Sequence, residues 1–182
     1  MIPDKKLNLS TGGLLTSADW INEFANIIDL GVARDIGKGK PLYCVVTITT
    51  AVNLTSDLDG VQFFVRLAPT STIPVAAHWT YFLLGCSMLY TEYSLPKGEQ
   101  VVFPLHNGVM PAGRDAGAIL TPATGQRYVW GHASIIDLTT GIVSARAPGA
   151  NAGAYDVDIT TTPPSWGSVQ APAYPRGYPV AP

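Results

Sequence analysis

The chain has 182 residues and a formal net charge of −2 at pH 7, with 47% hydrophobic and only 13% charged residues. This length favours one domain, and the composition excludes a disordered, charge-rich protein and a long solvated coiled coil. The negative net charge also excludes a broad basic surface for nucleic-acid phosphates, so no nucleic-acid partner is expected. The 18 glycines and 15 prolines favour many short strands over long helices.

The first predicted elements lie in the N-terminal quarter of the chain. A short helix is predicted over Ser17–Phe24, after a weak cap at Thr16 and Asp19. A strand-like run follows at Phe24–Leu30. The next run, at 42–49, is rich in residues that favour β-structure, and its alternation predicts a strand with one apolar face: Leu42, Cys44, Val46 and Ile48.

The clearest alternation predicts a strand at Val61–Leu67. Its odd-numbered apolar residues face inward, whereas Gln62 and Arg66 face outward. Five more short runs are predicted strands: His78–Gly85, Gln100–Leu105, Arg127–Ile136, Ile142–Arg146 and Tyr155–Ile159.

Turn clusters rich in glycine, proline and aspartate separate these runs, for example at 56–60, 96–98 and 139–141. About eight strands with almost no helical period predict an antiparallel sandwich or barrel. We expect this domain to cover residues 1–159, including a short N-terminal arm. The glycine-rich stretch at 106–125 shows no pattern and is expected to be a long loop.

The last segment, residues 160–182, has a different character. It holds six prolines, which lack the donor that a sheet interior needs, so an extended arm is predicted. Three aromatic residues interleaved with the prolines are the expected anchors of this arm: Trp166, Tyr174 and Tyr178. Either the domain itself or, as we favour, a neighbouring subunit holds them.

The sequence predicts neither a leader nor a membrane span. No apolar region follows the first lysines, and the most apolar stretch, Val75–Tyr90, is interrupted by polar residues and too short to cross a bilayer. Cys44 and Cys86 lie in apolar runs. They are predicted to be two buried thiols of a protein made in a reducing cytosol, with a disulfide as the alternative.

No set of residues predicts an active site. The three histidines, His78, His106 and His132, lack metal-ligand spacing, so no metal and no cofactor is expected. Asp156 and Asp158 share a strand face, as solvated carboxylates do, and are not expected to form an acid–base pair.

Two further motifs are interpreted as turns. Asp57-x-Asp59-Gly60 lacks the distal ligands of a calcium loop. Gly37-Lys38-Gly39-Lys40 is not a phosphate loop, because its glycine spacing is wrong and a strand follows it. Lys38 and Lys40 are therefore expected on a surface turn at a sheet edge, with contact to an acidic neighbour as the alternative.

Several segments resemble one protein family. The stretch Asn26–Gly31, followed by Arg34–Val46, is similar to a segment of the jelly-roll capsid cement (decoration) proteins of tailed bacteriophages. Arg127-Tyr128-Val129 and Thr139–Ala145 resemble two later pieces of that family, in the expected order. The matches are spread over most of Phe24–Ala147.

The resemblance implies an antiparallel jelly roll and a non-enzymatic structural protein of the virion. Such a protein is made in the host cytoplasm and sits on the outer surface of the phage head. Its partners are the major capsid protein and further copies of itself, as a dimer or trimer. Asp29, Arg34 and Asp35 are expected to fix the local geometry around the Lys38–Lys40 turn.

Two alternatives stay open. A carbohydrate-binding jelly-roll module, such as a host-surface adhesin, requires an exposed aromatic platform on one sheet face. A small β-barrel enzyme of the cupin type requires a His/Glu metal cluster, which the scattered histidines do not predict.

Overall fold

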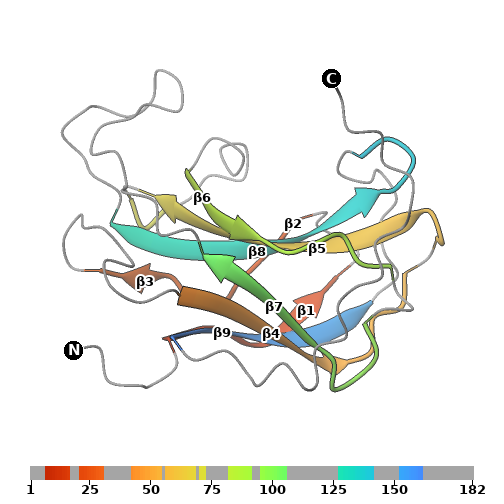
Figure 1. Ribbon diagram of the computed structural model, residues 1–182, viewed down its shortest axis with the longest axis horizontal. Helices are drawn as coiled ribbons and strands as arrows, with labels where there is room; N and C mark the ends of the chain where they lie inside the picture. Colours follow the sequence, from red (N-terminus) through yellow and green to blue (C-terminus); the bar gives the residue numbers. More distant parts are fainter. Residues whose placement is uncertain are drawn as a thin grey trace.

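The computed structural model describes residues 7–16, 21–30, 42–54, 56–68, 70–72, 82–91, 95–105, 127–141 and 152–161. This part of the chain holds nine strands and no helix. The strands form two antiparallel sheets that pack against each other (Figure 1). The all-β sandwich predicted from the sequence is therefore confirmed.

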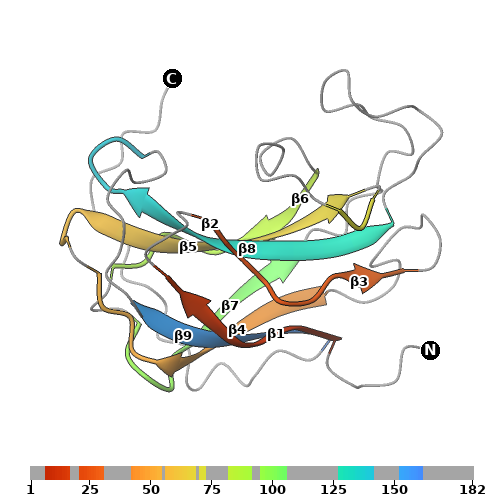
Figure 2. The same cartoon turned by 180° about the vertical axis from the view of Figure 1, so that it is seen from behind.

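The first layer is a four-stranded sheet with the order β1-β9-β4-β7. Its strands are β1 (Leu7–Leu15), β9 (Gly153–Thr160), β4 (Leu42–Thr50) and β7 (Gln100–Leu105). The first and last strands of the described chain are thus neighbours, and Leu7 pairs with Ile159. This pairing joins residues from nearly opposite ends of the sequence (Figure 2).

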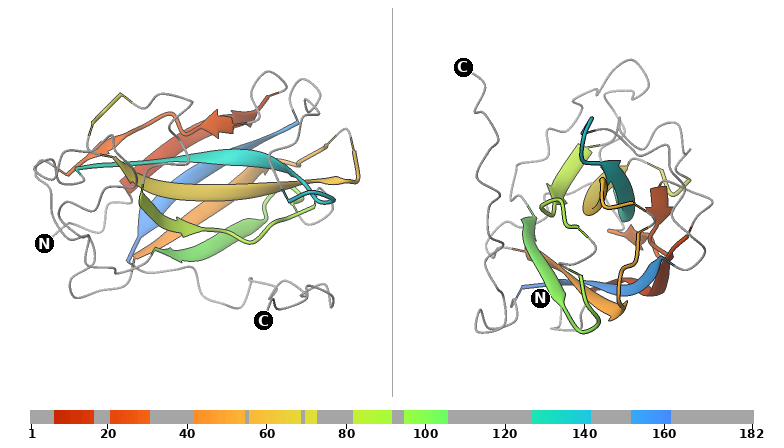
Figure 3. Two further views of the ribbon diagram at one scale, coloured as in Figure 1. Left: turned by 90° about the horizontal axis from the view of Figure 1, so that it is seen from above. Right: turned by 90° about the vertical axis from the view of Figure 1, so that its right-hand side faces the viewer.

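The second layer is a five-stranded sheet with the path β2-β8-β5-β6. It is built from β2 (Ile21–Glu23), β8 (Tyr128–Asp137), β5 (Asp59–Ala68) and β6 (Phe82–Cys86). The two-residue strand β3 (Ile28–Asp29) also pairs with β8. β2 and β3 therefore lie one after the other along the same edge of β8. The strands of the two sheets run obliquely to one another (Figure 3).

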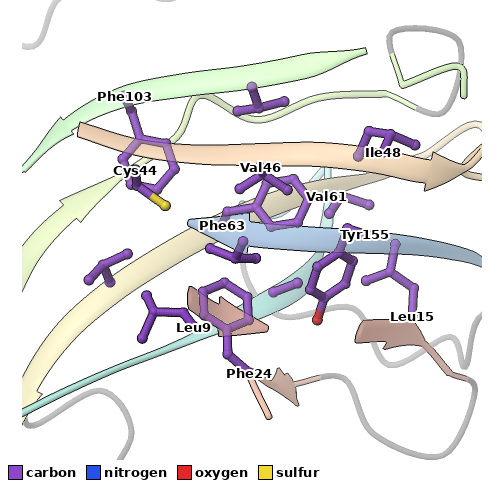
Figure 4. Close-up of a cluster of buried hydrophobic side chains, with 14 of the residues drawn as sticks. Leu9, Leu15, Phe24, Cys44, Val46, Ile48, Val61, Phe63, Phe103 and Tyr155 are labelled. Carbon is purple, nitrogen blue, oxygen red and sulfur yellow. The ribbon is translucent and has the colours of Figure 1, made fainter. Parts of the chain in front are cut away.

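The core lies between the two sheets, and Tyr155 is its largest fully buried side chain (Figure 4). The ring of Tyr155 makes edge-to-face contacts with Phe63 at 5.5 Å and with Phe24 at 5.8 Å between ring centroids. Burying an aromatic or large aliphatic side chain stabilises a fold by about 1.5–3 kcal/mol. The inward face of β5 is completely buried, as its alternation predicts: Val61, Phe63, Val65 and Leu67.

Most predicted strands are present, with ends shifted by a few residues. The helix predicted over Ser17–Phe24 is wrong for its described part, because residues 21–23 form β2 and pair with Ser134, Ala133 and His132. Pairing with β8 outweighs the weak helical pattern here. The run Phe24–Leu30 contributes only the two residues of β3, and Ile142–Arg146 lies outside the described residues.

Candidate interaction surfaces

Two segments that carry the family resemblance meet at one end of the five-stranded sheet. Arg127, just before β8, binds Asp29 of β3 through two hydrogen bonds, Nε to Oδ1 at 2.5 Å and Nη2 to Oδ2 at 2.6 Å. The Arg127 guanidinium also lies 5.2 Å from the ring centre of Tyr128. We call Asp29, Arg127 and Tyr128 the β3–β8 clamp.

The β3–β8 clamp fixes the position of β3 beside β8 and contributes little to the free energy of unfolding. The hydrogen bonds that Arg127 donates to Asp29 raise the pKa of Arg127, and the negative charge of Asp29 acts in the same direction. Both side chains are more than 40% exposed, so water and salt screen their attraction. The Leu30 N–H adds a backbone bond to the Arg127 carbonyl (3.0 Å), which holds the end of β3 against β8.

A second residue of the same motif, Asn26, ties the two sheets together. Its backbone N–H donates to the Leu9 carbonyl at 2.9 Å, and its side-chain Nδ2 donates to Asn8 Oδ1 at 3.1 Å. Leu9 and Asn8 belong to β1 of the opposite sheet. The residues around β3 therefore contact β8 on one side and β1 on the other, whereas the Lys38–Lys40 turn whose geometry they were expected to fix lies outside the described residues. Arg34 and Asp35, expected to share this role, lie outside the described residues.

The outer face of the five-stranded sheet carries a row of stacked side chains. His132 of β8 stacks on Phe64 of β5 (4.9 Å between ring centroids) and on Trp130 of β8 (5.3 Å). The Arg66 guanidinium lies 5.4 Å from the centre of the Phe64 ring. We call these four residues the aromatic row.

The aromatic row is buried, with exposed fractions between 0% and 6%. Arg66 does face outward from the core, as the alternation predicts, yet it is 4% exposed rather than solvated. Burial lowers the pKa of Arg66, while the charge of Cys86 acts in the opposite direction. Buried as it is, the aromatic row does not form the exposed platform that the carbohydrate-binding alternative requires.

The outer face of the four-stranded sheet is different, because its outward side chains are mostly half-exposed. Asp156 and Asp158 of β9 lie here, opposite the core residues Tyr155 and Val157, as predicted. The Gly12 N–H donates to Asp156 Oδ1 at 2.7 Å. Asn8 Nδ2 donates to Asp158 Oδ1 at 3.2 Å. These carboxylates are held by β1 and are not paired with each other.

Cys44 and Cys86 are free thiols, so the prediction of two thiols rather than a disulfide is confirmed. Cys44 is fully buried, whereas Cys86 is only partly buried, which corrects the expectation that both lie inside. Burial raises the pKa of both thiols. A raised pKa keeps a thiol protonated and makes it a poor nucleophile.

Among the described residues, no group of three or more His, Cys, Asp or Glu side chains is placed to hold a metal ion.

Asp59 is buried at the start of β5, and its N–H donates to the Ser56 carbonyl (3.0 Å), which confirms a turn before this strand.

All five side chains predicted to contact partners or to mark the surface turn lie outside the described residues: Lys38, Lys40, Trp166, Tyr174 and Tyr178. Sequence reasoning did not find the aromatic row. Its signal was present, because aromatic and basic residues alternate in both Phe64-Val65-Arg66 and Trp130-Gly131-His132. The register that pairs Phe64 with His132 and Arg66 with Trp130 comes only from the structure.

No protein-family model matches the chain, and no curated protein matches it. Within the described residues, no helix has the length and hydropathy needed to span a membrane.

Proposed function

We propose that this protein is a capsid cement protein that binds the outer surface of a phage head and stabilises contacts between major capsid protein subunits. The observation that carries the proposal is the β3–β8 clamp. Asp29 and Arg127 belong to two separate segments that resemble the cement family, 98 positions apart, and the fold joins them in one bidentate ion pair. Two of the segments behind the resemblance are thus in direct contact in the fold.

The strand order supports the jelly-roll interpretation. If β2 and β3 are counted as one interrupted strand, eight strands remain, and the two sheets take the order 1-8-3-6 and 2-7-4-5. Strands that are far apart in sequence then pair across each sheet, as in a jelly roll, an architecture used by viral capsid proteins, lectins and cupins. The order therefore fits the cement proposal, and the resemblance selects it among these classes.

Binding by repetition explains how such a protein can work through shallow contacts. A homo-oligomer that grips several shell subunits converts every later contact into an intramolecular one. Avidity then exceeds the affinity of a single contact by about 10²- to 10⁴-fold. Modest, flat contact surfaces on a rigid sandwich are sufficient for this task.

The test adds the purified full-length protein to expanded heads from a phage whose gene for this protein has been deleted. We expect saturable binding and a higher melting temperature of the heads, measured by calorimetry. Unchanged melting at saturating protein would refute the cement role. A glycan array run with the same protein tests the adhesin alternative, and specific glycan binding without head binding would favour it.

A deletion of residues 162–182 tests the proposed arm. β9 ends at Thr160, so this deletion leaves every described strand intact. We expect a folded protein by circular dichroism with lower occupancy on the heads, because the anchors Trp166, Tyr174 and Tyr178 are gone. Full occupancy by the truncated protein would show that the arm does not contact the shell.

A further inference from the structure

The two outer sheet faces of this molecule differ in what they can offer a partner. On the five-stranded sheet, the aromatic row is already buried within the chain. On the four-stranded sheet, the outward residues of β4, β7 and β9 are half-exposed or exposed, except for Val45. A partner that binds a sheet face directly therefore meets the four-stranded sheet.

The edge strands of the four-stranded sheet, β1 and β7, are poorly suited to strand addition, which leaves the face as the better contact surface. Two irregularities interrupt the pairing of β1 with β9, between Asn8 and Ser10 and between Ser10 and Gly13. β7 contains Pro104, which lacks a backbone donor. Bulges and prolines are common ways in which proteins prevent a new strand from pairing with an edge.

The outer face of the four-stranded sheet carries several short, stiff side chains beside the larger Tyr43 and Gln100. Described residues that contribute to it include Thr47, Thr49, Val102, Pro104 and Thr160. Such side chains lose little conformational entropy when a partner covers them. None of the described outward positions of its strands holds a lysine or an arginine, whereas Asp156 and Asp158 give the face two negative charges.

From these observations we infer that the outer face of the four-stranded sheet is the surface that docks on the shell, and that the shell presents basic side chains to Asp156 and Asp158. This inference rests on the proposed function and deepens it. Asp156 and Asp158 are two positions apart on β9, so their side chains lie on the same face about 7 Å apart. Their bonds to Gly12 and Asn8 hold the carboxylates in place before binding.

The size of this face fits a weak contact that is repeated many times. Four strands spaced by about 4.8 Å, each about eight residues long at about 3.3 Å per residue, make a face of about 500 Å². A stable one-to-one complex buries about 800 Å² on each partner. A flat footprint of this size suits a weak contact, and the avidity of an oligomer on a shell multiplies its strength.

Two kinds of variant test the inference on the same gene-deleted heads. Asp156→Asn/Asp158→Asn removes both charges and keeps an Oδ1 acceptor for the Gly12 and Asn8 donors. Thr47→Arg, opposite Asp156 in the register, puts bulk and positive charge on the face. We expect the double variant to need about 3- to 10-fold more protein for half-occupancy, and Thr47→Arg at least 10-fold more.

Asp57→Asn is the matched control for charge. Asp57 lies in the turn before β5 of the other sheet and is exposed, so its loss changes the net charge by one without touching the docking face. We expect it to bind like the wild type, with Asp156→Asn alone as the comparison. Binding of the wild type is also expected to weaken with added salt, and to do so less steeply in the double variant.

The outcomes separate the two proposals. If the wild type does not bind the heads, the proposed function fails. If the wild type binds but either Thr47→Arg or the double variant binds equally well, the docking inference is overturned and the cement role stands. Thermal melts of each free variant show that it is folded. Should Thr47→Arg fail to fold, the nearly isosteric double variant decides alone.

Discussion

The buried thiol of Cys44 makes the stability of the sandwich depend on pH above neutrality. Cys44 lies in β4 with no exposed surface, and burial, with a smaller contribution from the charge of Asp158, raises its pKa. In the unfolded chain a thiol ionises near pH 8.5. Above that pH the unfolded state loses a proton that the folded state keeps, so the free energy of unfolding falls as the pH rises.

We therefore expect the free energy of unfolding to be about 2 kcal/mol lower at pH 10 than at pH 8, from the shift at Cys44 alone. Urea unfolding at both pH values measures it. Cys44→Ala should lose most of this pH dependence, although its stability at pH 8 is lower. Cys86→Ala is the control and should retain most of it, because Cys86 is only partly buried. An unchanged slope in Cys44→Ala would contradict the assignment.

Residue patterns predicted the inward face of β5 well, because burial between two sheets demands strict alternation. They did not predict that Arg66 would be buried on the opposite face. Alternation identifies the two faces of a strand but does not reveal how much of the outer face is exposed. The same limit applies to Trp130 and His132, whose stacking depends on the register between β5 and β8.

At the scale of elements, Phe24 attaches the segment between β2 and β3 to β8, with which both short strands pair. Phe24 lies between these two short strands, and its N–H donates to the Gly131 carbonyl at 2.9 Å. Its ring lies over Gly131, so closely that a Cβ at this position would collide with the ring and with the Phe64 carbonyl oxygen. Glycine in the middle of β8 therefore allows the ring to reach Tyr155 in the core.

We expect Gly131→Ala to destabilise the protein by about 1–3 kcal/mol, the usual cost of overpacking a core. Gly141→Ala is the control, because its Cβ meets no atom within 4 Å. Gly141 has a φ of 70°, so alanine there costs about 1–2 kcal/mol from the backbone alone, with no steric overlap added. Urea unfolding of both variants measures the difference. A Gly131→Ala protein no less stable than Gly141→Ala would contradict the close contact.

This packing explains why the N-terminal elements were the hardest to predict. The segment at 21–24 holds Ile21 and Phe24, three residues apart, which is a helical spacing. In the fold, contacts with β8 and the core decide its conformation. β1 was not predicted as a strand because Ser10, Thr11, Gly12 and Gly13 break its alternation, and its two irregularities are visible only beside β9.

At the scale of the whole molecule, the pairing of β1 with β9 makes the fold depend on both ends of the described chain. Leu7 pairs with Ile159 and Leu15 with Gly153, so this contact closes only after almost all of the sequence is available. Loop-closure entropy must be overcome before such distant contacts stabilise the fold. Folding is therefore expected on the millisecond-to-second scale typical of sandwiches with non-local strand pairing.

Deleting residues 1–15 tests how far the sandwich depends on this closure. The deletion removes Leu9 and Leu15, both fully buried, and leaves one edge of β9 without its partner strand. Each of these leucines is worth about 2–5 kcal/mol in a core, and together they approach the whole stability of a domain of this size. We therefore expect the truncated protein to show no cooperative urea transition by near-UV circular dichroism.

Leu14→Ala is the control for this deletion. Leu14 lies on the same strand but is 50% exposed, so its truncation should change the free energy of unfolding by less than about 0.5 kcal/mol. Together the two experiments distinguish the loss of the buried leucines of β1 from an effect of any side-chain truncation on this strand. A deletion variant that still unfolds cooperatively would mean that β9, β4 and β7 complete the sheet without β1, and that the two ends of the described chain are not needed to close the fold.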